Sequence, residues 1–149
     1  VAGLRSGQSS VVTVGTSRSG YESGSADISG SANDTGSSLN ITFAVTELSS
    51  TAFEEGDGDT VVLAFTVQAD VADAQINGLT LSATGDLNDA NEVGAVKVFA
   101  DANGDGVADT SELVAEGSYT TDNGSVTFTF NEALSITTEA SQVLITYEL

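Results

Sequence analysis

Apolar and polar residues alternate with a period of two over several short segments of this 149-residue chain. Successive side chains of a β-strand point to opposite faces, so this pattern is typical of strands with one buried and one solvent-facing side. The alternating apolar positions are Leu39, Ile41, Phe43 and Val45; Val61, Leu63, Phe65 and Val67; Leu79 and Leu81; Val96 and Val98; Val126, Phe128 and Phe130; and Val143, Ile145, Tyr147 and Leu149. Helical periodicity is nearly absent, so the pattern predicts antiparallel strands throughout.

Turn-forming residues separate these segments. The stretches 54–59, 85–94 and 122–125 are rich in Gly, Asp and Asn, and Asn123-Gly124 is a typical hairpin sequence. The chain has no proline, which suits strands that must keep their N–H donors. We therefore expect residues 39–149 to form an all-β domain, an antiparallel Ig-like or jelly-roll β-sandwich. The lack of cysteine excludes an antibody-type domain with its buried disulfide.

The first 38 residues differ in composition from the rest. Residues 10–14 read as an extended strand in which Val11, Val12 and Val14 are apolar. Residues 15–38 follow, and 13 of these 24 are Gly or Ser, which predicts a flexible linker. The sequence thus predicts two parts: an N-terminal strand with its linker over residues 1–38, and the sandwich over residues 39–149.

Charge and composition exclude several functions. The chain carries 22 acidic and 3 basic residues, for a net charge of −19, and it has no His or Cys. The three cations, Arg5, Arg18 and Lys97, form no basic face for nucleic acid or anionic lipid, and no apolar run is long enough for membrane insertion. Without His, the usual acid–base and nucleophilic sites cannot be built, so we expect no enzyme activity.

One motif carries specific chemistry. Residues 101–112 read D-A-N-G-D-G-V-A-D-T-S-E and match the calcium loop of an EF-hand at every ligand position. Calcium prefers six to eight oxygen ligands, and a loop with this spacing of ligand residues can place its oxygens around the ion. The expected ligands are Asp101, Asn103, Asp105, the Val107 carbonyl, Asp109 and Glu112, and Gly106 makes the sharp turn. The sequence therefore predicts a bound Ca²⁺.

The flanks of this loop indicate its context. Residues 96–99 read as a strand, and residues 113–115 as a short helical turn or a strand, so the loop is not between two helices. It resembles the EF-hand-like calcium loops of dockerins and thrombospondin type 3 repeats. That resemblance covers about a dozen residues and implies an extracellular structural ion, because millimolar calcium outside cells saturates even weak sites.

Two other acidic clusters and three glycosylation sequons remain. The cluster Asp86, Asn88, Asp89, Asn91 and Glu92 lacks the loop spacing and predicts either a second ion or a solvated turn. The cluster Glu54, Glu55, Asp57 and Asp59 reads as a hairpin tip, with a metal site as the alternative. The sequons begin at Asn33, Asn40 and Asn123, and they predict glycans if the chain is secreted.

Two functions are compatible with these features. The first is a structural subunit of an extracellular filament or surface layer, in which residues 10–14 complete the sheet of the next copy and calcium offsets the charge of stacked subunits. This arrangement is similar in architecture to strand-donating pili and to TasA-like or archaeal bundling-pilus fibres. The alternative for residues 10–14 is pairing within their own chain.

The second function is a monomeric, calcium-stabilised adhesion or carbohydrate-binding module that contacts surface glycans. Sugar-binding surfaces commonly expose aromatic rings, but this chain has no Trp and only Tyr21, Tyr119 and Tyr147. The aromatic content therefore favours the structural subunit.

Overall fold

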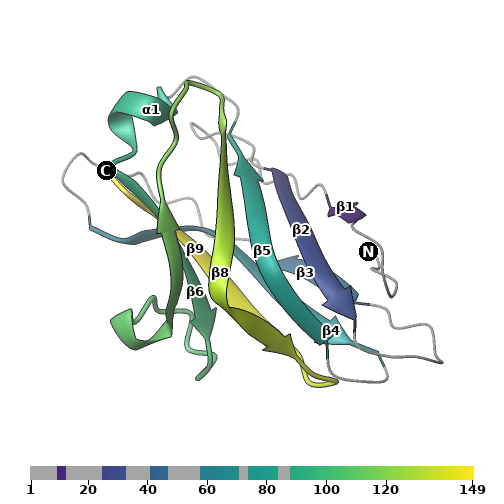
Figure 1. Cartoon of the computed structure of the whole chain (residues 1–149). Coiled ribbons are helices and arrows are strands. Elements are labelled where there is room, and N and C mark those ends of the chain that lie inside the picture. Colours follow the sequence, from purple (N-terminus) through teal and green to yellow (C-terminus); the bar gives the residue numbers. More distant parts are fainter. Residues whose placement is uncertain (1–9, 13–24, 33–40, 47–57, 71–73, 84–87) are drawn as a thin grey trace.

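A computed structural model describes residues 10–12, 25–32, 41–46, 58–70, 74–83 and 88–149 of the chain. They form two antiparallel sheets with very little helix, which confirms the predicted all-β fold (Figure 1). The elements are β1 (Ser10–Val12), β2 (Ser25–Ala32), β3 (Ile41–Thr46), β4 (Thr60–Ala69), β5 (Ala74–Ser82), α1 (Asp89–Glu92), β6 (Ala95–Asp101), the 3-10 turn η1 (Thr110–Glu112), β7 (Leu113–Gly117), β8 (Ser125–Ile136) and β9 (Ser141–Glu148).

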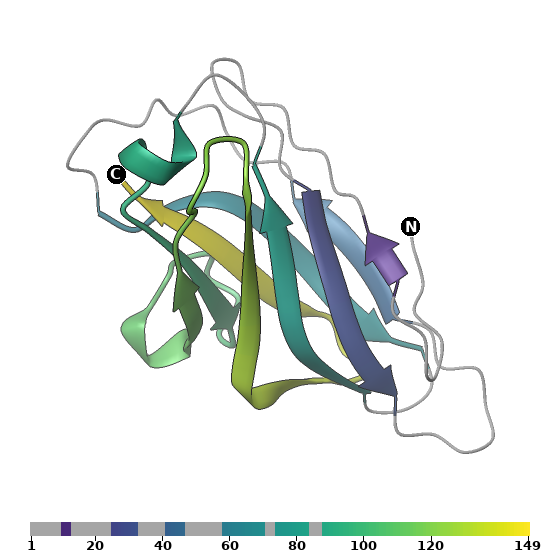
Figure 2. The ribbon, with the colours of Figure 1, turned by 45° about the horizontal axis from the view of Figure 1, so that its top comes forward.

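The two sheets lie face to face as the layers of a sandwich (Figure 2). One has the strand order β1-β2-β5-β8, and the other has the order β3-β4-β9-β6-β7. The chain changes sheet at several connections, including those from β7 to β8 and from β8 to β9. Neighbours in each sheet are therefore often far apart in sequence, as in the pairing of β4 with β9.

The main core lies between the sheets and uses the alternating positions. In β8, Val126, Phe128 and Phe130 are buried while the residues between them are exposed. The same side of β9 contributes Val143 and Ile145, with Tyr147 packed against them. The hydroxyls of Tyr119 and Tyr147 are hydrogen-bonded at 2.8 Å and their rings meet edge to face. Both tyrosines therefore lie against the core.

A second, smaller core covers the outer face of the five-stranded sheet. Phe99 of β6, Leu144 of β9 and Ala64 of β4 lie in one row across three adjacent strands and are almost fully buried. The next row contains Lys97 and Thr146, and the row on the other side contains Asp101, Gln142 and Thr66. The outer face of this sheet is therefore partly apolar, which simple alternation does not predict.

Part of the Gly/Ser-rich segment also forms a strand in the described structure. Residues 25–32 form β2, which pairs antiparallel with β5 over its whole length. β1 then pairs with β2 of the same chain, with Ser10 opposite Ile28 and Val12 opposite Ala26. Strands from the first 38 residues thus belong to the four-stranded sheet, because main-chain pairing with a formed strand does not require apolar side chains.

Two local predictions were also resolved. Residues 113–115, for which the sequence left a helical turn or a strand open, lie in β7. The Asn123-Gly124 turn adopts the left-handed conformation at Asn123, with φ of 49°. However, β7 and β8 on either side of it belong to different sheets, so it is not the tight hairpin of one sheet that the dipeptide predicts.

Candidate calcium-binding loop

The predicted calcium loop connects β6 to β7 at one end of the sandwich. It begins at Asp101, the last residue of β6, and ends in η1, directly before β7 (Figures 1 and 2). Because Asp101 occupies the outer row with Gln142 and Thr66, its side chain lies on the outer face of the sheet. The strand thus fixes the first expected ligand while the rest of the loop projects beyond it.

Hydrogen bonds from the loop's own backbone organise its first half. The carboxylate of Asp101, only 4% exposed, accepts the N–H groups of Gly104 at 2.7 Å and Gly106 at 2.9 Å. Asn103 accepts the N–H of Asp105 at 3.0 Å, and Asp105 accepts that of Val107 at 2.8 Å. These three side chains are the expected ligands at positions 1, 3 and 5, so the loop is wound around their oxygens.

Two glycines allow this winding. Gly104 has φ of 72° and Gly106 has φ of 75°, a left-handed conformation that other residues adopt only with strain. A Cβ at either position would meet no described atom within 4 Å. Backbone conformation rather than crowding therefore requires glycine here, which agrees with the sharp turn expected at Gly106.

Glu112 closes the loop from its far end. Its Oε1 accepts the N–H of Ala102 at 2.9 Å, which joins the end of the loop to its beginning. Its Oε2 is buried and has no hydrogen-bond partner among the described residues. The turn η1 places Glu112 for this contact, with the Glu112 N–H donating to the Asp109 carbonyl at 2.9 Å. The expected position-12 carboxylate thus presents one oxygen with unused acceptor capacity.

The loop also packs on the protein. Ala108 lies against the second core of Ala64, Phe99 and Leu144. Val107, whose carbonyl is the expected ligand at position 7, has a side chain that is 55% exposed. The loop is therefore anchored by one small apolar residue beneath it while its ligand-bearing part stays near the surface.

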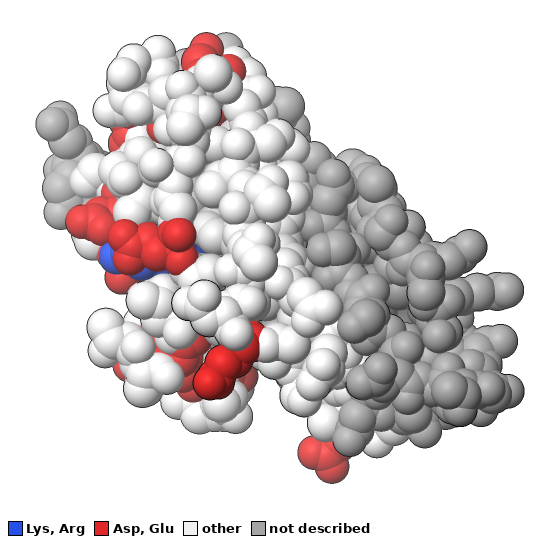
Figure 3. Space-filling model, in the orientation of Figure 1, with Lys and Arg blue, Asp and Glu red and all other residues white. Residues whose placement is uncertain are grey.

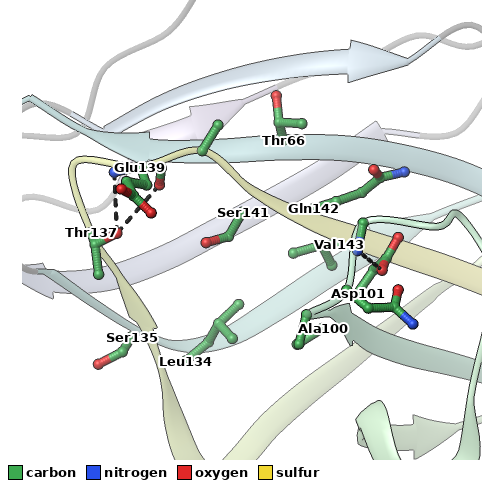
Figure 4. A pocket seen from close by; sticks show the side chains of 14 residues that line it. Thr66, Ala100, Asp101, Leu134, Ser135, Thr137, Glu139, Ser141, Gln142 and Val143 are labelled. Carbon is green, nitrogen blue, oxygen red and sulfur yellow. Dashed lines mark hydrogen bonds between the residues drawn. The ribbon is translucent and has the colours of Figure 1, made fainter.

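A hollow of about 540 Å³ adjoins this loop. Figure 4 shows the strands that contribute to it: Thr66 comes from β4, Asp101 from β6, Ser135 from β8, and Ser141 and Gln142 from β9. Asn103 and Gly104 of the loop line it as well. One wall of the hollow is thus the first part of the predicted calcium loop, which the sequence pattern did not reveal.

The donor set fits calcium, although the carboxylates do not surround a common point in this structure. The expected ligands offer only oxygen, which matches a hard cation, and a carboxylate oxygen that accepts an N–H keeps a lone pair for an ion. Within the described ranges, no group of three or more Asp or Glu side chains is arranged as around a metal ion. Asp101, Asn103, Asp105, the Val107 carbonyl, Asp109 and Glu112 would hold the ion.

Charged side chains are distributed unevenly over the described surface. Figure 3 shows acidic atoms at several places and one small basic area that adjoins them. Lys97 is the basic residue of the described ranges, and its Nζ lies 2.8 Å from Asp59 Oδ1 and 3.0 Å from Glu148 Oε2. Hydrogen bonds to Asp59 and Glu148 raise the pKa of Lys97 above its ordinary value, although burial opposes them. The Lys97 ammonium group therefore pairs with Asp59 and Glu148 rather than with the carboxylates of the calcium loop.

The remaining predicted site residues have different outcomes. Eight of them lie outside the described residues: Val14, Tyr21, Asn33, Asn40, Glu54, Glu55, Asp57 and Asp86. Asp59 pairs with Lys97. Asn123 is exposed, as a glycan would require, and Val11 and Val12 pair within their own chain as parts of β1. Asn88 is the N-cap residue of the short helix α1, and Asp89, Asn91 and Glu92 lie within it, away from the 101–112 loop.

Comparisons with protein-family models, with curated proteins and with solved structures find no match for this chain. In the part of the chain that the structure describes, no helix has the length and apolar character needed to cross a membrane.

Proposed function

We propose that this chain is a calcium-stabilised structural subunit of an extracellular filament or surface layer. The loop at residues 101–112 carries the proposal. The observation that supports it most is the buried Oε2 of Glu112, which has no hydrogen-bond partner among the residues that the structure describes. A buried carboxylate oxygen without a donor is costly, and a bound cation removes that cost. The ion would fasten the end of β6 to the start of β7.

The net charge of −19 supports calcium as part of assembly. Identical subunits of this charge repel one another, and the repulsion falls when divalent cations bind or when salt screens it. One calcium ion in the loop neutralises two of these charges. An extracellular setting follows from the same chemistry, since weak structural calcium sites are filled at millimolar concentrations.

Strand exchange is the proposed mode of assembly. β1 has three residues and pairs with residues 26–28 of the eight-residue β2, so it holds only part of that edge. A short edge strand loses few hydrogen bonds when it leaves its own sheet, and an equivalent strand from another copy can replace it. Repeated head-to-tail exchange produces an open filament rather than a closed dimer.

The alternative is a monomeric calcium-stabilised adhesion or carbohydrate-binding module. Two observations favour it: β1 already pairs within its own chain, and the polar hollow beside the loop offers room for a small ligand. A sugar would bind there by hydrogen bonds rather than by stacking, because Tyr119 and Tyr147 are occupied in the core.

The test is the molar mass of the native chain, measured by light scattering after size-exclusion chromatography, with calcium and with a chelator. The filament proposal predicts large species with calcium and smaller ones with the chelator. Deleting residues 1–20 should remove the large species, whereas substituting only Val11 and Val12 by Thr, which keeps the backbone donors, should weaken them. A monomer under all conditions would favour the module, and unaltered filaments from the truncated chain would refute strand exchange.

A further inference from the structure

We infer that the junction between α1 and the turn before β8 is a second cation site, independent of the 101–112 loop, with Asp89 as its anionic ligand. Asp89 is the first residue of α1 and is completely buried, with 0% of its surface exposed. Its Oδ2 accepts the backbone N–H of Asn123 at 3.0 Å. Its Oδ1 is buried and has no hydrogen-bond partner among the residues described.

The adjacent residue, Asn88, also has a buried side-chain oxygen without a hydrogen-bond partner among the described residues. Asn88 occupies the N-cap position of α1, where an Asn side chain ordinarily accepts a helix N–H, yet no such capping bond involves it in the described structure. Its Oδ1 is instead buried and lacks a partner within the described ranges. At this helix end, the backbone N–H of Asn88 instead donates a hydrogen bond to Glu92 Oε2 at 2.7 Å. The Asn88 oxygen is thus left free for another ligand.

The chemistry of these two oxygens points to a cation. Both are acceptors, and one belongs to a carboxylate that has been removed from water, a state that is tolerated when an opposite charge is close. Lys97 is the basic residue of the described ranges, and it is held by Asp59 and Glu148. A water molecule that donates a hydrogen bond to the Asp89 oxygen would leave its charge uncompensated. A small hard cation supplies the charge and prefers oxygen ligands.

Calcium is the cation that the surroundings favour. It accepts irregular ligand sets that combine carboxylate, amide and backbone oxygens with water, whereas magnesium demands a near-ideal octahedron. Among the described residues, the side chains of Asn88 and Asp89 provide few ligands, so several positions would be filled by water. We therefore expect binding in the weak range of extracellular sites, about 0.1–1 mM.

This site lies at the opposite end of β6 from the predicted loop. Two residues separate the end of α1 from the start of β6, and the 101–112 loop starts where β6 ends. In Figures 1 and 2, α1 and the loop lie at different ends of the sandwich. Substitutions at one site therefore leave the ligands of the other in place, and the two sites can be separated by experiment.

The test is the number of calcium ions bound by the full chain, measured by equilibrium dialysis at constant ionic strength. We expect two ions per chain, one after Asp89→Asn, and one after the double substitution Asp101→Asn and Glu112→Gln. The charge-matched control Glu132→Gln, at an exposed position of β8, should keep two. If Asp89→Asn fails to fold, Asn88→Ala should still weaken the second ion at least several-fold.

A spectroscopic measurement identifies the site directly. The Asn123 amide donates to Asp89, so its resonance in a ¹⁵N–¹H correlation spectrum should shift with calcium in the native chain and in the double loop variant, but not in Asp89→Asn. A single ion that is lost only from the loop variant would overturn this inference and leave the proposed function standing. A single ion lost only from Asp89→Asn would support this inference and overturn calcium binding by the 101–112 loop. If the native chain bound no calcium, both the inference and the proposed function would be overturned.

Discussion

At the scale of single residues, the predicted loop depends on backbone conformation as much as on ligands. Gly104 and Gly106 both adopt left-handed φ, and they place the N–H groups that bind the Asp101 carboxylate. These N–H groups hold the Asp101 carboxylate in place in this structure. The ligand geometry of the loop therefore rests on residues that would not themselves contact calcium through a side chain.

Gly106→Ala tests this dependence. We expect it to lower the free energy of unfolding by about 1–2 kcal/mol, because a left-handed conformation is costly for alanine even where space is free. Gly58→Ala is the matched control: its Cβ would also meet no described atom within 4 Å, but its φ is not left-handed, so its effect should be much smaller. Urea denaturation measures both, and equal losses in the two variants would contradict the explanation.

At the scale of elements, the sequence predicted most of the strands but missed one strand that depends on main-chain pairing. The alternating segments correspond to β3, β4, β5, β6, β8 and β9, because burial between two sheets imposes a period of two. β2 was missed because Ile28 is its only large apolar residue, and its strand conformation depends on pairing with β5. Main-chain pairing of this kind leaves no trace in hydrophobic periodicity.

The candidate site was predictable to a similar extent. The spacing of residues 101–112 was enough to propose the ligands, and the glycine positions agree with it. The packing of Ala108 on the second core could not be predicted, because Leu144 of that core lies on the face opposite to the alternating core positions Val143 and Ile145. The buried oxygens of Asn88 and Asp89 that lack a partner in the described part of the chain likewise depend on how distant elements meet.

The second core should couple sheet packing to the loop. We expect Leu144→Ala to cost about 2–5 kcal/mol, as is typical for a fully buried leucine. It should also weaken calcium binding several-fold, because Ala108 of the loop packs on the same row. Leu79→Ala, in β5 of the other sheet, is the control. We expect it to cause a similar loss of stability but to leave the calcium affinity unchanged.

Denaturation and calcium titration of both variants provide the measurement. Equal calcium affinity for Leu144→Ala and Leu79→Ala would mean that the outer core does not support the loop. The comparison is made at a temperature where both variants remain folded, so that the affinity reports the loop rather than global unfolding.

At the scale of the whole molecule, electrostatic repulsion is the dominant long-range force. A net charge of −19 on a 15.0 kDa chain favours expanded states, and salt reduces this effect by shortening the range of the repulsion to about 8 Å near 0.15 M. Specific calcium binding adds stability beyond screening, about 2.7 kcal/mol when free calcium is one hundred times the dissociation constant. The two effects have different concentration dependences.

The melting temperature separates them. It should rise gradually with sodium chloride and rise further with millimolar calcium chloride at the same total ionic strength. Magnesium chloride is the control for divalent charge, and its effect should be smaller because the loop ligands suit calcium. Identical curves for the two divalent salts would show that screening alone accounts for the stabilisation.

The position of β9 has a consequence for how the chain reaches this fold. β9 lies between β4 and β6 in the five-stranded sheet, yet it follows every other described strand in the sequence. Until residues 141–148 have been synthesised, β4 and β6 lack the strand that joins them. The five-stranded sheet therefore cannot be completed before β9 is available, and a chain held unfolded until then would avoid exposing two unpaired strand edges.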